Sequence, residues 1–457
     1  MMKALKAAPL PVVLVIVSLL CPTELSLYLG GLRLPPHRIA LLLLAPVAIY
    51  RLLVRRGTKI RLFDLGFLAF AVWTVSAYVQ HAGWEGFVYG GSVALEAFGG
   101  YVVARAYVRS PDDVLATLRV MVVAIAVAAL FALPETLFGQ LFTHDALRAL
   151  TGYTHPTGIE QRLGLTRAYG TFDHPIHHAT FCAALLAMLW FAERNAARRR
   201  KTVALAVGAT FLGISSAPLL GLGIQGGLIA WERVTRGIAA RRMLTLAILA
   251  GLYGGVSMVS SRTPFAIIAT GFTLDSWTGF YRLQIWEAGL TNVWAHPLTG
   301  LGLADWERPA WMVSSTVDAF WLVVAMRTGI PAVALLLVAI GLLALAVLKG
   351  RRRMPDRHLA RLGTGWVISL AALVLVGCTV HYWNALTTYF FFFLGLGGVW
   401  ADPIRMAART GVTAAPKRQQ LAPLAMPTPP PLPQNLARPT ATHPARPMPP
   451  PLPAYAP

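Results

Sequence analysis

Apolar runs of membrane-spanning length recur along most of this chain. A helix needs about 20 mostly apolar residues to cross a ~30 Å hydrocarbon core. Backbone groups inside a bilayer must pair with one another, and a helix pairs them within one segment. We therefore predict an all-α polytopic membrane domain over residues 1–402, with about 12 transmembrane helices. The expected spans are 9–27, 38–54, 62–80, 88–107, 114–133, 175–193, 202–214, 217–233, 243–260, 328–348, 361–380 and 386–402.

The positive charge of the chain lies in short clusters between the apolar runs. The net charge is +21, which in a soluble protein would suggest a nucleic-acid partner. Here the clusters fit the excess of Lys and Arg in the cytoplasmic loops of membrane proteins, so no nucleic acid is expected. An N-terminus inside places every cluster, and both termini, on the cytoplasmic side of the membrane. The clusters lie at 51–61, 194–201, 233–242 and 349–361.

Two long segments then fall on the outer, periplasmic face, near 134–174 and 261–327. Both are rich in aromatic residues, glycine and histidine. Loops of this length inside a compact domain are usually functional rather than connective.

The C-terminal segment 403–457 differs in kind from the rest. Half of the chain's 32 prolines lie after Asp402. Such a composition cannot bury a core, and we expect a disordered cytoplasmic tail with polyproline II character. A docking segment for a cytoplasmic partner with aromatic grooves is the alternative.

Arginines are scarce on the outer face, which makes each one a candidate for binding a charged group. A guanidinium presents a planar fork of donors that matches phosphate oxygens, and it can stabilise developing charge without a metal. The alternative for each is an arginine that snorkels or pairs within its loop. The outer arginines are Arg33, Arg148, Arg162, Arg167, Arg262, Arg282 and Arg308.

The second long loop carries an ordered set of motifs. The sequence reads FYRLQIWE from Phe280, HPLTGLG from His296, STVDAFWL from Ser315 and MRTGIP from Met326. This order resembles the outer loop of the bacterial O-antigen ligase/polymerase superfamily, and RAYGTFDHP from Arg167 resembles a passage that enters a transmembrane helix in the same superfamily. The chain departs from the pattern where Ala319 follows Asp318, and where no arginine follows Ser215 and Ser216.

The resemblance implies a C-type membrane glycosyltransferase that inverts its sugar without a metal or cofactor. The substrate would be a glycan linked to a polyprenyl diphosphate in the lipid bilayer. Arg167 and Arg282 match motif positions and, with Asp318, are the catalytic candidates. The candidates for substrate binding are Tyr169, His174, His177, Trp286, His296 and Arg262.

Asp318 and the histidines are each open to two interpretations. Asp318 either caps a helix that starts at the membrane surface or accepts the proton of an acceptor hydroxyl. His174 and His178 have a spacing that suits two helical metal ligands, but no nearby glutamate or cysteine completes a site. Pro175 is expected to start the helix, so histidines that contact the interface or the substrate are the other interpretation.

We therefore expect a polymerase that joins polyprenyl-diphosphate-linked repeat units at the periplasmic face of the bacterial inner membrane. A chain-length regulator or export machinery is a possible partner. Ligation of the finished glycan to a lipid or protein acceptor is a close alternative. A flippase is the rival from another class, but it should show internal repeats and polar residues along a central pathway.

Overall fold

The computed structural model describes residues 8–29, 31–54, 59–153, 158–238, 240, 243, 276–354 and 356–402. Apart from residue 243, the expected span 243–260 lies outside the described residues, as do Arg262 and the tail 403–457. Within the described ranges the chain is mostly helical, with two short antiparallel strand pairs.

The first half of the chain comprises α2 (Leu10–Leu20), η1 (Thr23–Leu25), β1 (Leu27–Leu29), β2 (Leu32–Leu34), α3 (Pro36–Val54), α4 (Leu62–Ala94), η2 (Leu95–Gly99), α5 (Gly100–Tyr107), α6 (Pro111–Phe138), α7 (Phe142–Thr151), β3 (Gln161–Arg162), β4 (Leu165–Thr166), α8 (Pro175–Ala183), α9 (Leu186–Ala192), α10 (Ala196–Leu212), α11 (Ser216–Val234) and η3 (Thr235–Gly237). The second half comprises α14 (Ser276–Ala295), α15 (Phe320–Thr328), α16 (Ile330–Gly350), η4 (Arg351–Arg353), α17 (Arg357–Val376), α18 (Ala385–Leu396) and α19 (Gly398–Ala401).

Several of these helices have the length and composition to cross a membrane. Among the described residues, 6 qualify: Pro36–Val54, Leu62–Tyr107, Pro111–Phe138, Pro175–Ala192, Ile330–Arg353 and Arg357–Val376. The shorter apolar helices Leu10–Leu20 and Ala385–Ala401 add to them. The chain is thus an all-α protein with several helices of membrane-spanning length. Helices α10 and α11 occupy the expected spans 202–214 and 217–233 but do not belong to this set.

The long helix α4 doubles back on itself, as the expected spans 62–80 and 88–107 predict. Its backbone leaves helical geometry at Ala82 and Gly83, where Gly83 has a φ of 52°. The rings of Tyr78 and Tyr89 lie 5.0 Å apart, which a straight helix with a rise of about 1.5 Å per residue could not achieve. A Cβ built on Gly86 would lie 2.0 Å from the carbonyl oxygen of Tyr78, so glycine permits the close approach.

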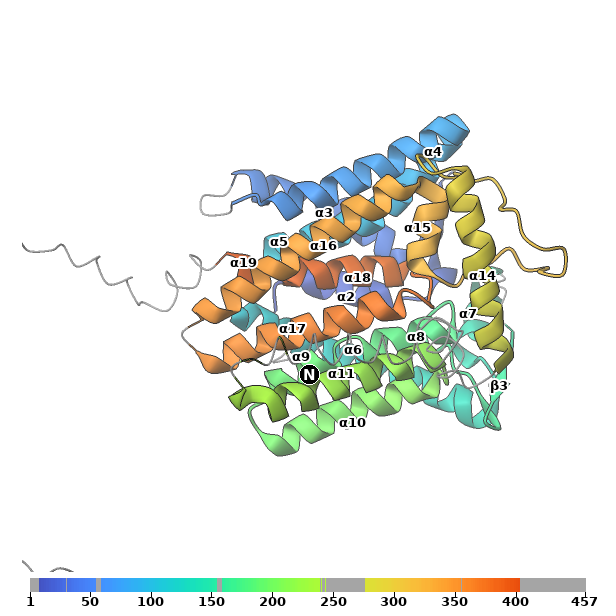
Figure 1. Ribbon diagram of the computed structural model, residues 1–457. Coiled ribbons are helices and arrows are strands. Elements are labelled where there is room, and N and C mark those ends of the chain that lie inside the picture. Colours follow the sequence, from blue (N-terminus) through green and yellow to red (C-terminus); the bar gives the residue numbers. More distant parts are fainter. Residues whose placement is uncertain are drawn as a thin grey trace, which may run out of the picture. The chain divides into compact units, whose positions relative to one another are not determined.

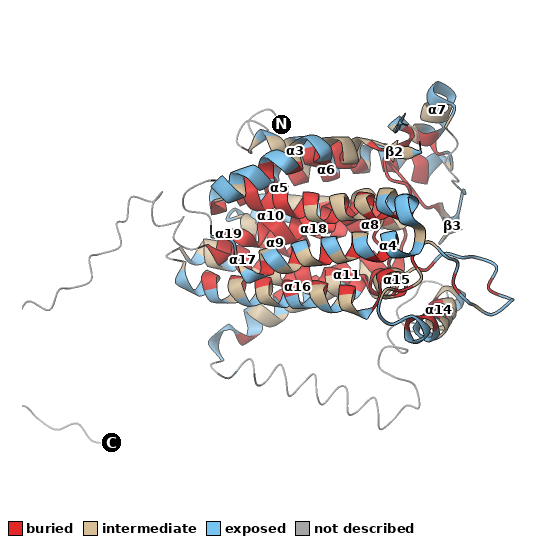
Figure 2. Ribbon diagram, turned by 90° about the horizontal axis from the view of Figure 1, so that it is seen from above, coloured by how far each residue is buried: buried red, intermediate tan, exposed pale blue. Residues whose placement is uncertain are grey.

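The centre of the bundle is formed by α18 and α5, which pack against each other. Every residue of α18 from Leu386 onward is buried, including the run Phe390 to Phe393, and a helix that is apolar all round belongs in a core. Figure 2 shows these buried residues in red along α18. All of α5 is buried as well, and its Arg105 is neutralised by Asp64 at 3.0 Å and Asp402 at 2.8 Å.

The two ends of the bundle differ in character (Figure 1). At one end Arg61 pairs with Asp402 at 3.1 Å, and the basic clusters of α10, α11 and α17 meet around a common pocket that Arg199, Arg233 and Arg361 help to line. At the other end lie α7, the β3–β4 pair, α14 and the segment that leads into α15. The basic clusters in the described residues are therefore separated from the two long segments that carry the candidate site.

Candidate functional site

A tight hairpin in the first outer segment presents Arg167. Leu163 and Gly164 connect β3 to β4 with φ values of 54° and 74°, the left-handed pair that favours a two-residue hairpin turn. The register continues to Glu160 and Arg167, because the Arg167 backbone N–H donates to the Glu160 carbonyl at 2.9 Å. Directly opposite side chains interact across such a pair, and the Arg167 guanidinium forms an ion pair with the Glu160 carboxylate.

The guanidinium of Arg167 keeps unused donor capacity in spite of that ion pair. The residue is 2% exposed, and its Nε donates to the Gly213 carbonyl at 3.4 Å. Its Nη2 is buried and has no hydrogen-bond partner among the described residues. Burial of an unsatisfied charged donor is unfavourable unless a partner arrives.

Arg282 brings a second buried guanidinium from the other outer segment. It lies on α14, is 6% exposed, and forms no ion pair with any residue that the structure describes. Its Nε is buried without a hydrogen-bond partner in the described ranges. Arg162 of β3 donates to the Thr278 hydroxyl of α14 at 3.4 Å, so the two segments are in direct contact.

Asp318 completes the site from the chain that enters α15. Helix capping does not account for it, because Ala319 occupies the N-cap of α15 and no side chain caps that helix. Burial raises the pKa of Asp318, with a smaller contribution from Glu160, whereas Arg282 and Arg167 oppose the rise. The carboxylate therefore lies within electrostatic range of both candidate arginines.

These groups form what we call the outer charge cluster, after the face on which the sequence predicts them to lie; it consists of Glu160, Arg162, Arg167, Arg282 and Asp318. Burial lowers the pKa of Arg282; Arg162 and Arg167 lower it further, and Asp318 opposes them. Three cations against two anions leave a net positive charge. Unused guanidinium donors in a partly dry site suit an anion with several oxygens, such as a diphosphate.

The histidines of the first outer segment have structural partners of their own. His174 caps α8 by accepting from the Ile176 N–H at 3.1 Å, and Pro175 begins the helix as expected. The ring of His177 packs against that of Trp383 with centroids 3.6 Å apart. His178 points elsewhere and donates to the Ala209 carbonyl at 2.9 Å. His174 and His178 are therefore not arranged as a pair of ligands, and the described residues contain no cluster of metal-binding side chains.

The other candidates for substrate binding are distributed unevenly. Tyr169 is buried, and its hydroxyl donates to the Gly158 carbonyl at 3.1 Å beside the hairpin. Trp286 donates from its indole to the Cys378 carbonyl at 2.8 Å and so ties α14 to the end of α17. His296 is exposed, and its carbonyl closes a turn by accepting from the Gly300 N–H at 3.1 Å. The structure thus places Tyr169 near the cluster, assigns Trp286 a packing contact and leaves His296 at the surface.

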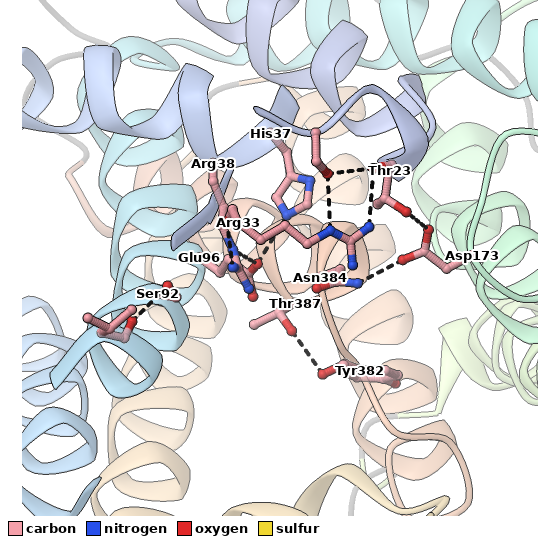
Figure 3. A network of polar contacts seen from close by, with 12 residues as sticks. Thr23, Arg33, His37, Arg38, Ser92, Glu96, Asp173, Tyr382, Asn384 and Thr387 are labelled. Atoms are coloured by element: carbon pink, nitrogen blue, oxygen red, sulfur yellow. Dashed lines mark hydrogen bonds and ion pairs between the residues drawn. The ribbon is translucent and has the colours of Figure 1, made fainter. Parts of the chain in front are cut away.

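The sequence analysis did not single out two polar features that the structure shows. Glu160 was not singled out, although the Leu163–Gly164 turn in the sequence could have predicted its pairing with Arg167. The short segment His381 to Asn384 was passed over as a connection. Asn384 has a φ of 50° and donates from its amide to Asp173 at 2.7 Å, and the Thr23 hydroxyl donates to the same carboxylate at 2.5 Å (Figure 3).

In comparison with known proteins, the chain matches no family model and no curated sequence.

Proposed function

We propose that the chain is an inverting glycosyltransferase of the membrane that polymerises polyprenyl-diphosphate-linked repeat units, with the outer charge cluster as its reaction centre. One observation carries the proposal. Arg167 and Arg282 come from two separate long segments, yet they lie within electrostatic range of the same carboxylate, and each keeps a buried donor nitrogen that has no partner among the described residues.

The chemistry follows from these groups. The oxygen of an acceptor hydroxyl attacks the anomeric carbon of the donor sugar, and the bond from that carbon to the diphosphate breaks. Negative charge then grows on the phosphate oxygens, where Arg167 and Arg282 stabilise it. The hydroxyl proton passes to Asp318, whose raised pKa brings it closer to the pH at which a carboxylate is an effective base. Attack from the face opposite the diphosphate inverts the anomeric centre.

The topology belongs to the same proposal. Twelve spans with both termini in the cytoplasm would place the basic end of the bundle inside and the outer charge cluster in the periplasm. A polyprenyl-linked glycan would then reach the cluster from the outer leaflet of the inner membrane.

Reconstitution tests the reaction directly. The purified full chain is placed in liposomes with a polyprenyl-diphosphate oligosaccharide as the sole sugar substrate, and the products are separated by gel and weighed by mass spectrometry. A ladder that increases by one repeat unit supports polymerisation. Transfer of one finished glycan to an added lipid acceptor, without a ladder, would identify a ligase instead, and movement of the substrate across the bilayer without new bonds would identify a flippase.

A further inference from the structure

A second pocket lies between α4, η2, α15 and the segment that precedes α18. The face of α15 that lines it consists of Phe320, Val323, Val324 and Arg327, which follow the helical repeat. The backbone N–H of Phe320 donates to the carbonyls of Gly377 at 2.8 Å and Val380 at 3.1 Å. Asp318 lies two residues before Phe320. The segment that these hydrogen bonds anchor therefore carries both a wall of the pocket and the proposed base.

The charged groups of the pocket already have partners. Glu96 projects from the π-helical turn η2 and accepts hydrogen bonds from Arg38 at 2.7 Å and His37 at 3.0 Å (Figure 3). Arg327 donates to the carbonyls of Gly302 at 3.1 Å and of Ala304. These contacts fix the walls of the pocket; Glu96 compensates Arg38, whereas Arg327 is bonded only to neutral carbonyls.

Several neutral groups of the pocket are also available. The hydroxyls of Tyr78 and Tyr89 donate to no residue that the structure describes, and the same holds for both ring nitrogens of His381. Nδ1 of His381 is also buried. The amide of Asn384 donates to Asp173, but its oxygen accepts nothing within the described ranges. The pocket thus offers a mixture of neutral donors and acceptors beside the guanidinium of Arg327.

Aromatic rings surround these polar groups. Tyr78 and Tyr89 lie 5.0 Å apart, and Trp383 packs between His177 and His381 with centroid distances of 3.6 Å and 5.6 Å. The C–H face of a sugar ring is weakly positive and packs on the negative face of an aromatic ring. Its hydroxyls both donate and accept, which the phenols, the imidazole and the amide oxygen can match.

We propose that this pocket is a saccharide subsite that holds a neutral pyranose ring of the acceptor glycan. Its role as the acceptor subsite rests on the proposed polymerase function, whereas the binding of a sugar does not. The ring would lie between the tyrosine pair and Trp383, with its hydroxyls bonded to Tyr78, His381 and Asn384. The acceptor would then extend along α15 towards Asp318.

Binding of a lipid-free sugar tests the subsite apart from catalysis. The probe is the repeat-unit oligosaccharide released by mild acid from the lipid carrier of producing cells, and its binding to the full chain in nanodiscs is measured by calorimetry. We expect saturable binding to the wild type. Tyr78→Phe, which removes only a hydroxyl, and His381→Gln should each weaken it about tenfold, as the loss of one hydrogen bond does. Tyr50→Phe is the matched control, because Tyr50 is exposed on α3.

A substitution in the outer charge cluster should have the opposite effect on binding and activity. Arg282→Lys should bind the oligosaccharide normally, because the probe carries no diphosphate, while losing polymerisation. No binding to the wild type, or binding lost in Arg282→Lys and kept in Tyr78→Phe, would overturn the subsite. Binding that depends on Tyr78 in a protein that forms no polymer would remove the proposed function and leave the saccharide site standing.

Discussion

Arg282 and Asp318 lie within electrostatic range of each other, yet burial outweighs their attraction on both sides. The pKa of Arg282 is lowered and that of Asp318 is raised, although each charge opposes the other's shift. A close ion pair normally shifts both pKa values in the opposite directions. The two charges are therefore incompletely compensated, a condition that is common where a site awaits a further ligand.

Replacement of Arg282 tests its role at the diphosphate. Lysine keeps the charge but loses the planar fork, so Arg282→Lys should lower the polymerisation rate by about 10²–10³, and Arg282→Ala should lower it further. Initial rates in liposomes measure the effect at equal protein levels. Arg308→Lys is the control, because Arg308 pairs with the exposed Asp305 instead of joining the outer charge cluster. Equal rates for Arg282→Lys and the wild type would contradict a bidentate phosphate contact.

Replacement of Asp318 should separate activity from stability. Asparagine keeps the shape of the side chain but accepts no proton, so Asp318→Asn should be inactive. Because the folded state raises the pKa of Asp318, its ionisation disfavours folding as pH rises through that range. Asp318→Asn should therefore melt at a higher temperature than the wild type at pH 7. An active variant would remove Asp318 from the reaction.

The wild-type pH profile gives an independent reading of the same carboxylate. Only ionised Asp318 can accept the proton, so activity should fall as pH decreases through its raised pKa. The acidic limb of kcat/KM should lie above that of an ordinary aspartate, near 3.9. A flat profile down to pH 4 would argue against a base with a raised pKa.

Metal removal tests the source of charge stabilisation. If Arg167 and Arg282 neutralise the leaving diphosphate, polymerisation should survive extensive washing with EDTA. Loss of activity that a single divalent ion restores would show that a metal shares this role. A chelator loaded with that ion serves as the control for effects on the membrane.

Reporter fusions test the orientation. An enzyme active only outside the cytoplasm should be active when fused after Gly300 and silent when fused after Arg353 or Ala408. The reverse pattern would invert the bundle and place the outer charge cluster in the cytoplasm.

The sequence predicted the local features well because each depends on neighbouring residues. Ser110 caps α6 by accepting from the Asp113 N–H at 3.2 Å, with Pro111 in the first turn, as Ser-Pro-Asp-Asp predicts. His174 and Pro175 start α8 in the same way. The apolar runs likewise predicted helices, because burial in lipid or in a core requires the same composition along a whole segment.

Contacts between distant segments were beyond sequence reasoning. Glu96 stands in an apolar run of the sequence, but its partners His37 and Arg38 depend on how α3 packs against η2. Similarly, Arg167 and Arg282 were chosen from separate loops, and only the Arg162–Thr278 contact shows that the loops meet. Periodicity identifies the face of a helix, but not which other helix covers it.

The π-helical turn at Leu95–Gly99 sets the direction, about the helix axis, in which the side chains of α5 point. Each residue of a helix turns the chain by about 100°, so the deletion of one residue in this turn would rotate Glu96 and Arg105 relative to one another. Glu96 is held by α3, and Arg105, about 13 Å further along the axis, is held by Asp64 and Asp402. The helix is thus held by ion pairs at two points along its length. A change in length between them cannot be absorbed at one end alone.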